Sequence, residues 1–294
     1  MESTAKPAPD IRDYQRCAWD MYLYFADFCR RHQLRHYVCG GCCIGALRHG
    51  GFIPWDDDID VFMPRPDYER LTELWPREAD TGRYSLCRSD REHNYHDCGT
   101  LIKDNRTTFI NRHSRHEDIN HGYMLDVIPL DAAAPQGLAR RLQLFYAMVF
   151  SLYNAQRLPD NQGSAVRLAS RLLLGLVPWK GLRYRLWRWA ERRMSRYPWE
   201  QAEYVSELVT GFRYMKLLYP AEIFGSGRDQ AFASGQVRLP ARAEDYLHQA
   251  FGDYMQLPPP EARVPKHDVF FADLERPYTE YKGIYYCVKE GEKV

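Results

Sequence analysis

Apolar residues recur at helical spacing early in the chain and in short strand-like runs after it. Between Ile11 and Arg31 they return every three or four positions and the segment ends in basic residues, which predicts a helix packed on a sheet. Pro66 to Trp75 predicts a second helix, with the proline near its start. Short apolar runs predict strands at 36–39, 58–62, 83–87, 100–103, 107–110 and 125–128. This order predicts a mixed α/β (α+β) fold.

A different pattern holds from about Leu138 to Arg196, where Leu, Trp and Tyr alternate with many arginines. No apolar run there reaches the roughly 20 residues that span a bilayer. The apolar stripes either pack on the core or lie in a membrane interface, the second alternative being peripheral membrane contact through 140–196. We divide the chain into a catalytic core over 1–134, a basic helical subdomain over 135–210 and a C-terminal segment over 211–294 that completes the active site.

Composition narrows the class of protein. The 294 residues carry 40 Lys+Arg against 39 Asp+Glu, so no global charge favours a nucleic-acid partner. The eight cysteines follow no disulfide framework and the N-terminal residues lack the apolar core of a signal peptide, which predicts a cytoplasmic location. Cys39 and Cys42 have the spacing that opens a zinc site, but without a second pair reduced core thiols are the favoured interpretation.

Candidate chemistry is concentrated at 54–61, Pro-Trp-Asp-Asp-Asp-Ile-Asp-Val. Four carboxylates within five positions repel one another unless a cation compensates them. In an extended strand Asp58 and Asp60 share one face, Asp56 has the same parity and Asp57 faces elsewhere. Carboxylate oxygens suit Mg²⁺, with Mn²⁺ as the alternative. The sequence thus predicts a metal site made by Asp58, Asp60 and Asp56.

Gly40 and Gly41 stand just upstream of the acidic cluster. A turn without Cβ atoms lets backbone N–H groups approach a phosphate closely. Together with the carboxylates, the glycine pair predicts a nucleotide-phosphate site.

The exact sequence of residues 40–65 indicates a protein family more specifically than the spacing of its glycines and carboxylates does. Gly-Gly-Cys-Cys-Ile-Gly-Ala-Leu-Arg-His-Gly-Gly-Phe-Ile-Pro-Trp-Asp-Asp-Asp-Ile-Asp-Val-Phe-Met-Pro-Arg closely resembles the signature of the LicD family of phosphocholine and phospho-alditol transferases, to which the fukutin-type proteins are related. Residues 123–131, Tyr-Met-Leu-Asp-Val-Ile-Pro-Leu-Asp, and a late motif at 246–267 extend the resemblance. One departure is Cys42-Cys43 where Thr-Leu or Ser-Leu is usual, which argues against side-chain phosphate contacts there.

The resemblance implies a nucleotidyltransferase-like mixed sheet core with flanking helices. It also implies a Mg²⁺-dependent transferase that moves a phosphorylated alcohol, such as phosphocholine, from a CDP-linked donor to a sugar of a cell-surface glycan or its lipid-linked precursor. The arginine excess between 140 and 196 predicts peripheral contact with the inner face of the cytoplasmic membrane, where a lipid-linked acceptor would lie. Two other classes stay open. A nucleotidyltransferase that moves a nucleoside monophosphate from an NTP to a small molecule or protein would use the same carboxylates, and a non-catalytic binding protein would retain only the fold.

Five residues complete the predicted site, in which Asp58 and Asp60 are also catalytic. Asp126 acts as a base or metal ligand, its alternative being a buried hydrogen-bond acceptor. Arg48 suits bidentate phosphate binding, its alternative being a salt bridge to the acidic cluster. Lys103, at a strand end, either binds substrate or is exposed. The resemblance adds Arg263 and His267 as substrate-binding candidates.

Overall fold

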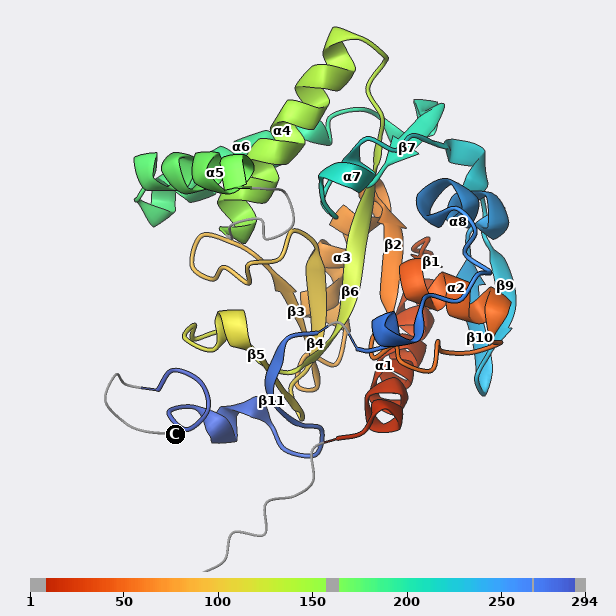
Figure 1. The fold of residues 1–294 in the computed structure, drawn as a ribbon, viewed down its shortest axis with the longest axis vertical. Coiled ribbons are helices and arrows are strands. Elements are labelled where there is room, and N and C mark those ends of the chain that lie inside the picture. Colours follow the sequence, from red (N-terminus) through yellow and green to blue (C-terminus); the bar gives the residue numbers. More distant parts are fainter. Residues whose placement is uncertain (1–8, 157–163, 266, 289–294) are drawn as a thin grey trace, which may run out of the picture.

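The computed structural model describes residues 9–156, 164–265 and 267–288, and a mixed sheet lies at its centre (Figure 1). The strand order is β1-β2-β6-β4-β3, β7 pairs with β6 and β8 with β7. Only β2 and β6 pair in parallel within this sheet. The strands are β1 (Tyr37–Val38), β2 (Asp60–Pro64), β3 (Tyr84–Arg88), β4 (Thr100–Asp104), β6 (Tyr123–Ala132), β7 (Tyr204–Ser206) and β8 (Tyr219–Pro220). The predicted mixed α/β fold is confirmed.

Helices cover this sheet, and the first is the one predicted from the apolar spacing. α1 (Ile11–Arg31) begins with a capping box in which Asp10 and Asp13 each accept the other's backbone N–H. Its Phe25 and Phe28 are fully buried. The other helices of the core are α2 (Gly40–Arg48), α3 (Arg65–Glu78) and α8 (Ala243–Phe251), so the helix predicted at Pro66 begins one residue earlier and extends three residues further.

Two short antiparallel pairs connect distant parts of the chain. β9 (Arg228–Phe232) and β10 (Gly235–Leu239) form a hairpin, whereas β11 (Val269–Asp273) pairs with β5 (Thr108–Asn111) across most of the sequence. The second pair holds the C-terminal segment against the core. The remaining short elements are α7 (Phe212–Met215) and 3₁₀ turns at Arg112–Ser114, Trp199–Gln201, Ala221–Ile223, Pro260–Ala262 and Tyr278–Tyr281.

Between 138 and 194 the described residues form three helices that project from one side of the core (Figure 1). They are α4 (Leu138–Ala155), α5 (Ser164–Leu176) and α6 (Lys180–Met194). α4 packs along α6 and both contribute to a second buried cluster, distinct from the main core, that includes Phe150 and Trp187. Among the helices that the structure describes, none has the length and apolar character needed to cross a bilayer.

The proposed division at 134 and 210 stays a prediction, and some residues in each of its three parts lie outside the described ranges. β7 precedes the second boundary and pairs with β6 through Asp131 and Ser206. The chain therefore returns from the three helices to the core sheet before it enters the predicted C-terminal segment.

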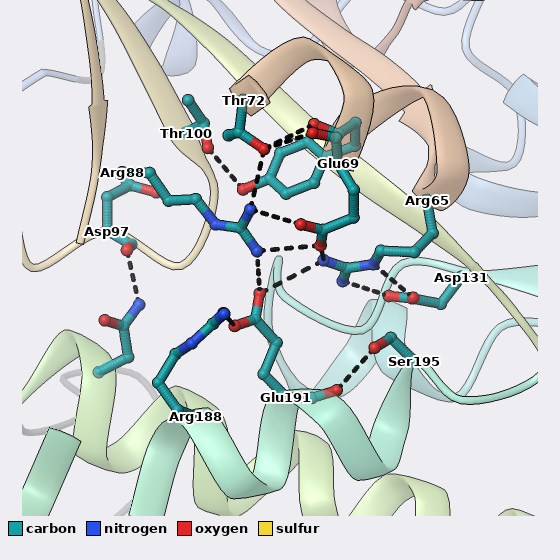
Figure 2. Close-up of polar contacts among 12 residues, drawn as sticks. Arg65, Glu69, Thr72, Arg88, Asp97, Thr100, Asp131, Arg188, Glu191 and Ser195 are labelled. Atoms are coloured by element: carbon teal, nitrogen blue, oxygen red, sulfur yellow. Dashed lines mark hydrogen bonds and ion pairs between the residues drawn. The ribbon is translucent and has the colours of Figure 1, made fainter. Parts of the chain in front are cut away.

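A buried ion network joins the three helices to the core (Figure 2). Arg65 of α3 donates two hydrogen bonds to the Asp131 carboxylate on β6, at 2.7 and 2.8 Å. Glu191 of α6 accepts from Arg88 of β3 at 2.7 Å and from Arg65 at 3.3 Å. Burial alone would raise the pKa of Glu191, but the neighbouring guanidinium groups lower it. Each buried charge thus has a hydrogen-bonded counter-charge.

Removing the shared cation tests this network. Arg65→Met leaves two buried carboxylates without their common partner, so we expect the free energy of unfolding in urea to fall by about 3–5 kcal/mol. The control Arg242→Met removes the exposed pairs of Arg242 with Glu222 and Asp245 and should cost less than about 1 kcal/mol. Equal losses in both variants would contradict the role of the network.

Burial also determines the charge of His36, which is 8% exposed and packs against the rings of Tyr22 and Phe25. Loss of hydration lowers the pKa of His36 to about 4, from an ordinary value of 6.5. The folded state therefore holds this imidazole neutral. Its contribution to stability is complete above pH 6.5 and is lost as the pH falls toward 4.

We expect the free energy of unfolding to decrease below pH 6.5 with a contribution from His36 of up to about 1.4 kcal/mol per pH unit. His36→Asn removes this contribution, while buried His121, with its pKa also lowered to about 4, keeps its own. Urea unfolding between pH 7 and pH 5 should show a shallower pH slope in the variant. An unchanged slope would show that His36 is not the titrating group.

Candidate active site

The site is built on the pairing of β2 with β6. These strands run parallel in the register that sets Asp60 opposite Asp126, and the Asp126 N–H donates to the Ile59 carbonyl at 3.3 Å. Ile59 and Val61 are buried on the other face, as the alternation predicts. Two carboxylates from distant parts of the sequence therefore lie side by side on one face of the sheet.

Four carboxylates line one cavity of about 400 Å³. They belong to Asp58, Asp60, Asp97 and Asp126, and the remaining walls come from the loop before β4, from β6, from α4 and from residues 209–211 after β7. Of the three projecting helices, α4 contributes to the site, because it brings Ser151 and Ala155 to the cavity. The described residues that line it include the His96 imidazole but no Phe, Tyr or Trp side chain.

The sequence did not indicate Asp97 as a site residue. It lies in the loop before β4, and α4 holds this loop: the Asn154 side chain donates to the Asp97 carbonyl at 2.7 Å (Figure 2), and the His96 ring lies 2.9 Å from the Ala155 carbonyl oxygen. The Asp97 carboxylate accepts the Gly99 N–H at 2.9 Å. A loop aspartate has no periodicity, so only the adjacency of β4 to β6 reveals its place.

The acidic segment before β2 differs from the prediction. One carboxylate oxygen from each of Asp56, Asp57 and Asp58 lies within 4.8 Å of the other two, so the expectation that Asp57 faces elsewhere is wrong. The reason is that β2 begins only at Asp60, and the two-residue alternation of a strand does not apply to irregular backbone. The predicted set Asp56, Asp58 and Asp60 therefore includes two members of this close group, and Asp60 lines the cavity together with Asp58.

His267 comes to the acidic segment from the opposite end of the chain. Its Nδ1 lies 3.1 Å from both carboxylate oxygens of Asp57, and its Nε2 lies 3.7 Å from Asp58 Oδ2. Burial alone would lower the pKa of His267, but the hydrogen bond to Asp57 and the charges of Asp58 and Asp57 raise it to about 9. His267 is therefore a cation at neutral pH and compensates part of the carboxylate charge.

The carboxylates remain under strong mutual repulsion. Burial and the charges of Asp58, Asp126, Asp56 and Asp97 raise the pKa of Asp60 well above its ordinary value. Burial, Asp97 and Asp58 likewise raise the pKa of Asp126 to about 8. One carboxylate oxygen of Asp126, Oδ1, is buried and has no hydrogen-bond partner within the described ranges.

This donor set fits a hard divalent cation. The unsatisfied buried oxygen and the raised pKa of Asp126 indicate negative charge without compensation, which a bound cation would supply, and carboxylate oxygens are the ligands that suit Mg²⁺ and Mn²⁺. A zinc site at Cys39 and Cys42 is disfavoured. Burial raises the pKa of both thiols well above the ordinary value of cysteine, which disfavours the thiolates that zinc requires.

Lys103 is not exposed, contrary to one alternative. It is 5% exposed on β4, where the registers of β4 with β6 place it on the same sheet face as Asp126. Burial lowers the pKa of Lys103, while the charges of Cys87, Asp126 and Asp97 oppose that shift. Lys103 is therefore a buried lysine on the sheet face that carries the cavity carboxylate Asp126.

The glycine pair forms the first turn of α2 itself, because the helix begins at Gly40. Gly40 has a φ of +53° and donates its N–H to the Tyr246 hydroxyl at 3.2 Å. A Cβ at Gly41 would overlap the Asp56 carboxylate, so glycine lets the acidic segment approach the helix N-terminus. The positive end of the helix dipole stabilises negative charge at this place.

Arg48 and Arg263 do not line the cavity. Arg48 donates to the Tyr254 carbonyl at 2.6 Å, and within the described part of the chain it has no carboxylate within ion-pair distance. Arg263 donates to the Pro258 carbonyl at 2.8 Å and stacks over the Trp55 ring. Both side chains hold the C-terminal segment, which carries His267, near the acidic segment.

Comparison with known proteins agrees with this geometry. Residues 33–128 match the family described as LicD/FKTN/FKRP, nucleotidyltransferase domain. This stretch contains the four carboxylates of the cavity, whereas Arg263 and His267 lie beyond it.

Two relatives were found among characterised and uncharacterised proteins. Over 262 residues the chain is 26% identical to the lipopolysaccharide cholinephosphotransferase LicD of Haemophilus influenzae, covering 87% of this chain and 96% of that protein. A stretch of 65 residues is 28% identical to an uncharacterized protein of Rickettsia prowazekii, covering 20% of this chain and 24% of that protein. The resemblance to the LicD family noted in the sequence is confirmed by the match of residues 33–128 to its nucleotidyltransferase domain and by the similarity of most of the chain to the Haemophilus influenzae protein.

Proposed function

We propose that this protein transfers a phosphorylated small alcohol, such as phosphocholine, from a CDP-linked donor to a sugar of a cell-surface glycan or its lipid-linked precursor. The observation that carries the proposal is the meeting of Asp58, Asp60, Asp97 and Asp126 in one cavity, within the stretch that matches the LicD family. The relative in Haemophilus influenzae, named a lipopolysaccharide cholinephosphotransferase, supports the choice of donor and acceptor class.

The proposed cofactor is Mg²⁺, with Mn²⁺ as its substitute, held by Asp58 and Asp60 with Asp56 at the edge of the group. Bound there, the cation supplies charge neutralisation to the donor diphosphate. His267 holds Asp57 and Asp58 in place through its contacts with both carboxylates. Lys103 is buried on the same sheet face as Asp126, and we propose that it helps to position this carboxylate.

In the proposed reaction the acceptor hydroxyl loses its proton and gains the phosphorylated alcohol. The acceptor hydroxyl oxygen attacks the phosphorus that carries the alcohol, and Asp126 takes the hydroxyl proton. The bond from this phosphorus to the bridging oxygen breaks, and CMP leaves with that oxygen. The first residues of α2, Gly40 and Gly41, offer the helix N-terminus to the donor phosphates.

Product analysis tests the proposal. With CDP-choline, CDP-ribitol or CDP-glycerol, Mg²⁺ and a glycan-precursor extract, we expect CMP to appear in equal amount with a phosphodiester-modified acceptor. Mass spectrometry of the acceptor and chromatography of the nucleotide measure the two products. Consumption of an NTP with pyrophosphate release and a nucleoside monophosphate on the acceptor would instead establish the nucleotidyltransferase alternative.

Single charge removals separate catalysis from folding. Asp60→Asn and Asp126→Asn should each lower kcat by at least about 100-fold, the usual range for loss of a metal ligand or general base. The melting temperature without metal should stay equal or rise, because each variant relieves carboxylate repulsion. Asp97→Asn should behave in the same way if this loop residue belongs to the site.

The matched control is Asp27→Asn, an exposed aspartate on α1 that pairs only with Arg30 and Arg31 among the described residues. Its kcat should equal that of the unaltered protein. Near-normal turnover of Asp60→Asn at saturating Mg²⁺ would remove the assigned site.

A further inference from the structure

Helix α5 exposes the side that an amphipathic helix normally buries. Leu168, Leu172 and Leu176 repeat every fourth residue and so form one stripe along the helix, and they are 59%, 60% and 73% exposed. Leu173, Trp179 and Leu182 continue this surface to the start of α6 and are also exposed. We call these six residues the outer apolar face.

The orientation of α5 is determined by contacts on its other side. Leu174 and Val177 pack against the second buried cluster, and the Tyr153 hydroxyl of α4 donates to the Leu173 carbonyl at 3.1 Å. Arg183 of α6 donates to the carbonyls of Leu174 and Val177, at 3.0 and 2.6 Å. The helix is therefore held with its leucine stripe outward, and the alternative in which these helices bury their apolar stripes against the core does not hold for α5.

The exposed charged side chains that the structure describes on α5 and α6 are all basic. Exposed basic side chains lie on α5 and α6, namely Arg167, Arg171, Lys180, Arg185, Arg192 and Arg193. Within α4, α5 and α6 the only acidic residue is Glu191, which is buried and paired with Arg65 and Arg88. Arg171 flanks the leucine stripe, because it lies three residues after Leu168 on the helix.

An apolar helical stripe bordered by exposed arginines, with a tryptophan at its end, has the chemistry of a helix that lies in the headgroup region of an anionic bilayer. We propose that the outer apolar face docks on such a membrane, with Leu168, Leu172 and Leu176 inserted among the lipid chains. Arg167 and Arg171 contact the lipid phosphates, and Trp179 lies at the level of the headgroups.

This surface belongs to the same helical unit as one wall of the cavity. Asn154 and Ala155 of α4 hold the loop of Asp97, and Tyr153 of the same helix end holds α5. Docking would therefore bring the cavity to a membrane surface, where a lipid-linked acceptor lies. The membrane contact itself rests on the outer apolar face alone and not on the proposed function.

Sedimentation of the full chain with vesicles tests the contact without donor or acceptor, so its failure and that of the proposed reaction are distinguishable. We expect binding to vesicles that contain phosphatidylglycerol, weaker binding at 500 mM than at 100 mM NaCl, and little binding to pure phosphatidylcholine, because Lys and Arg contacts with anionic lipid are screened by salt. Protein that stays in the supernatant at both salt concentrations would overturn the proposal.

Two paired variants separate the apolar and the electrostatic parts. Leu172→Ser with Leu176→Ser should weaken vesicle binding at least about tenfold, since each removes buried hydrocarbon from the interface. Arg167→Gln with Arg171→Gln should weaken it roughly tenfold at low salt and reduce the salt dependence. The matched control, Leu23→Ser with Ile284→Ser, removes exposed apolar side chains outside the face and should bind like the unaltered protein.

The depth of Trp179 in the bilayer provides an independent test of the membrane contact. Brominated lipid should quench tryptophan fluorescence of the bound protein, and Trp179→Phe should remove most of that quenching while sedimentation remains. If the leucine variants bind vesicles like the unaltered protein, the outer apolar face is not a membrane contact. If the unaltered protein does not bind vesicles and is a dimer that the leucine variants convert to a monomer, a second copy of the chain covers this face instead.

Discussion

The parallel pairing of β2 with β6 is the constraint on which the candidate site depends. It sets Asp60 against Asp126 in one register, and a slip by a single residue would turn one carboxylate into the core. Burial at this place, together with the charges of neighbouring carboxylates, raises the pKa of both groups. His267 compensates part of the negative charge, and a divalent cation is the natural source of the rest.

Several otherwise unrelated parts of the chain serve this arrangement. The β5–β11 pair holds the segment that delivers His267, and carbonyl contacts of Arg48 and Arg263 hold the preceding stretch. On the opposite side, α4 positions the loop of Asp97. The active site is therefore assembled from three regions that are far apart in sequence, which is why an isolated segment at 33–128 would lack part of it.

The buried ion network has a comparable role for the three projecting helices. Glu191 inserts a charge from α6 between Arg65 and Arg88 of the core, so the orientation of the helices is specified by hydrogen bonds as well as by apolar contact. Buried ion pairs contribute little net stability compared with apolar packing, but a misaligned pair is costly. This specificity keeps one side of the helical unit at the cavity while another side presents the outer apolar face.

The sequence by itself determined the helix at Ile11–Arg31, the strands around Asp60 and Asp126, the mixed fold and the resemblance to the LicD family, because periodicity and a dense local motif are properties of neighbouring residues. It misjudged Asp57, since strand parity was applied to residues that precede the strand, and it did not indicate Asp97, which no local pattern marks. Only the tertiary structure decided that Lys103 is buried, that Arg48 binds carbonyl groups and that the leucine stripe of α5 faces outward. These outcomes depend on which strands are adjacent and on which side of a helix finds a partner, and that is settled by contacts between residues far apart in the chain.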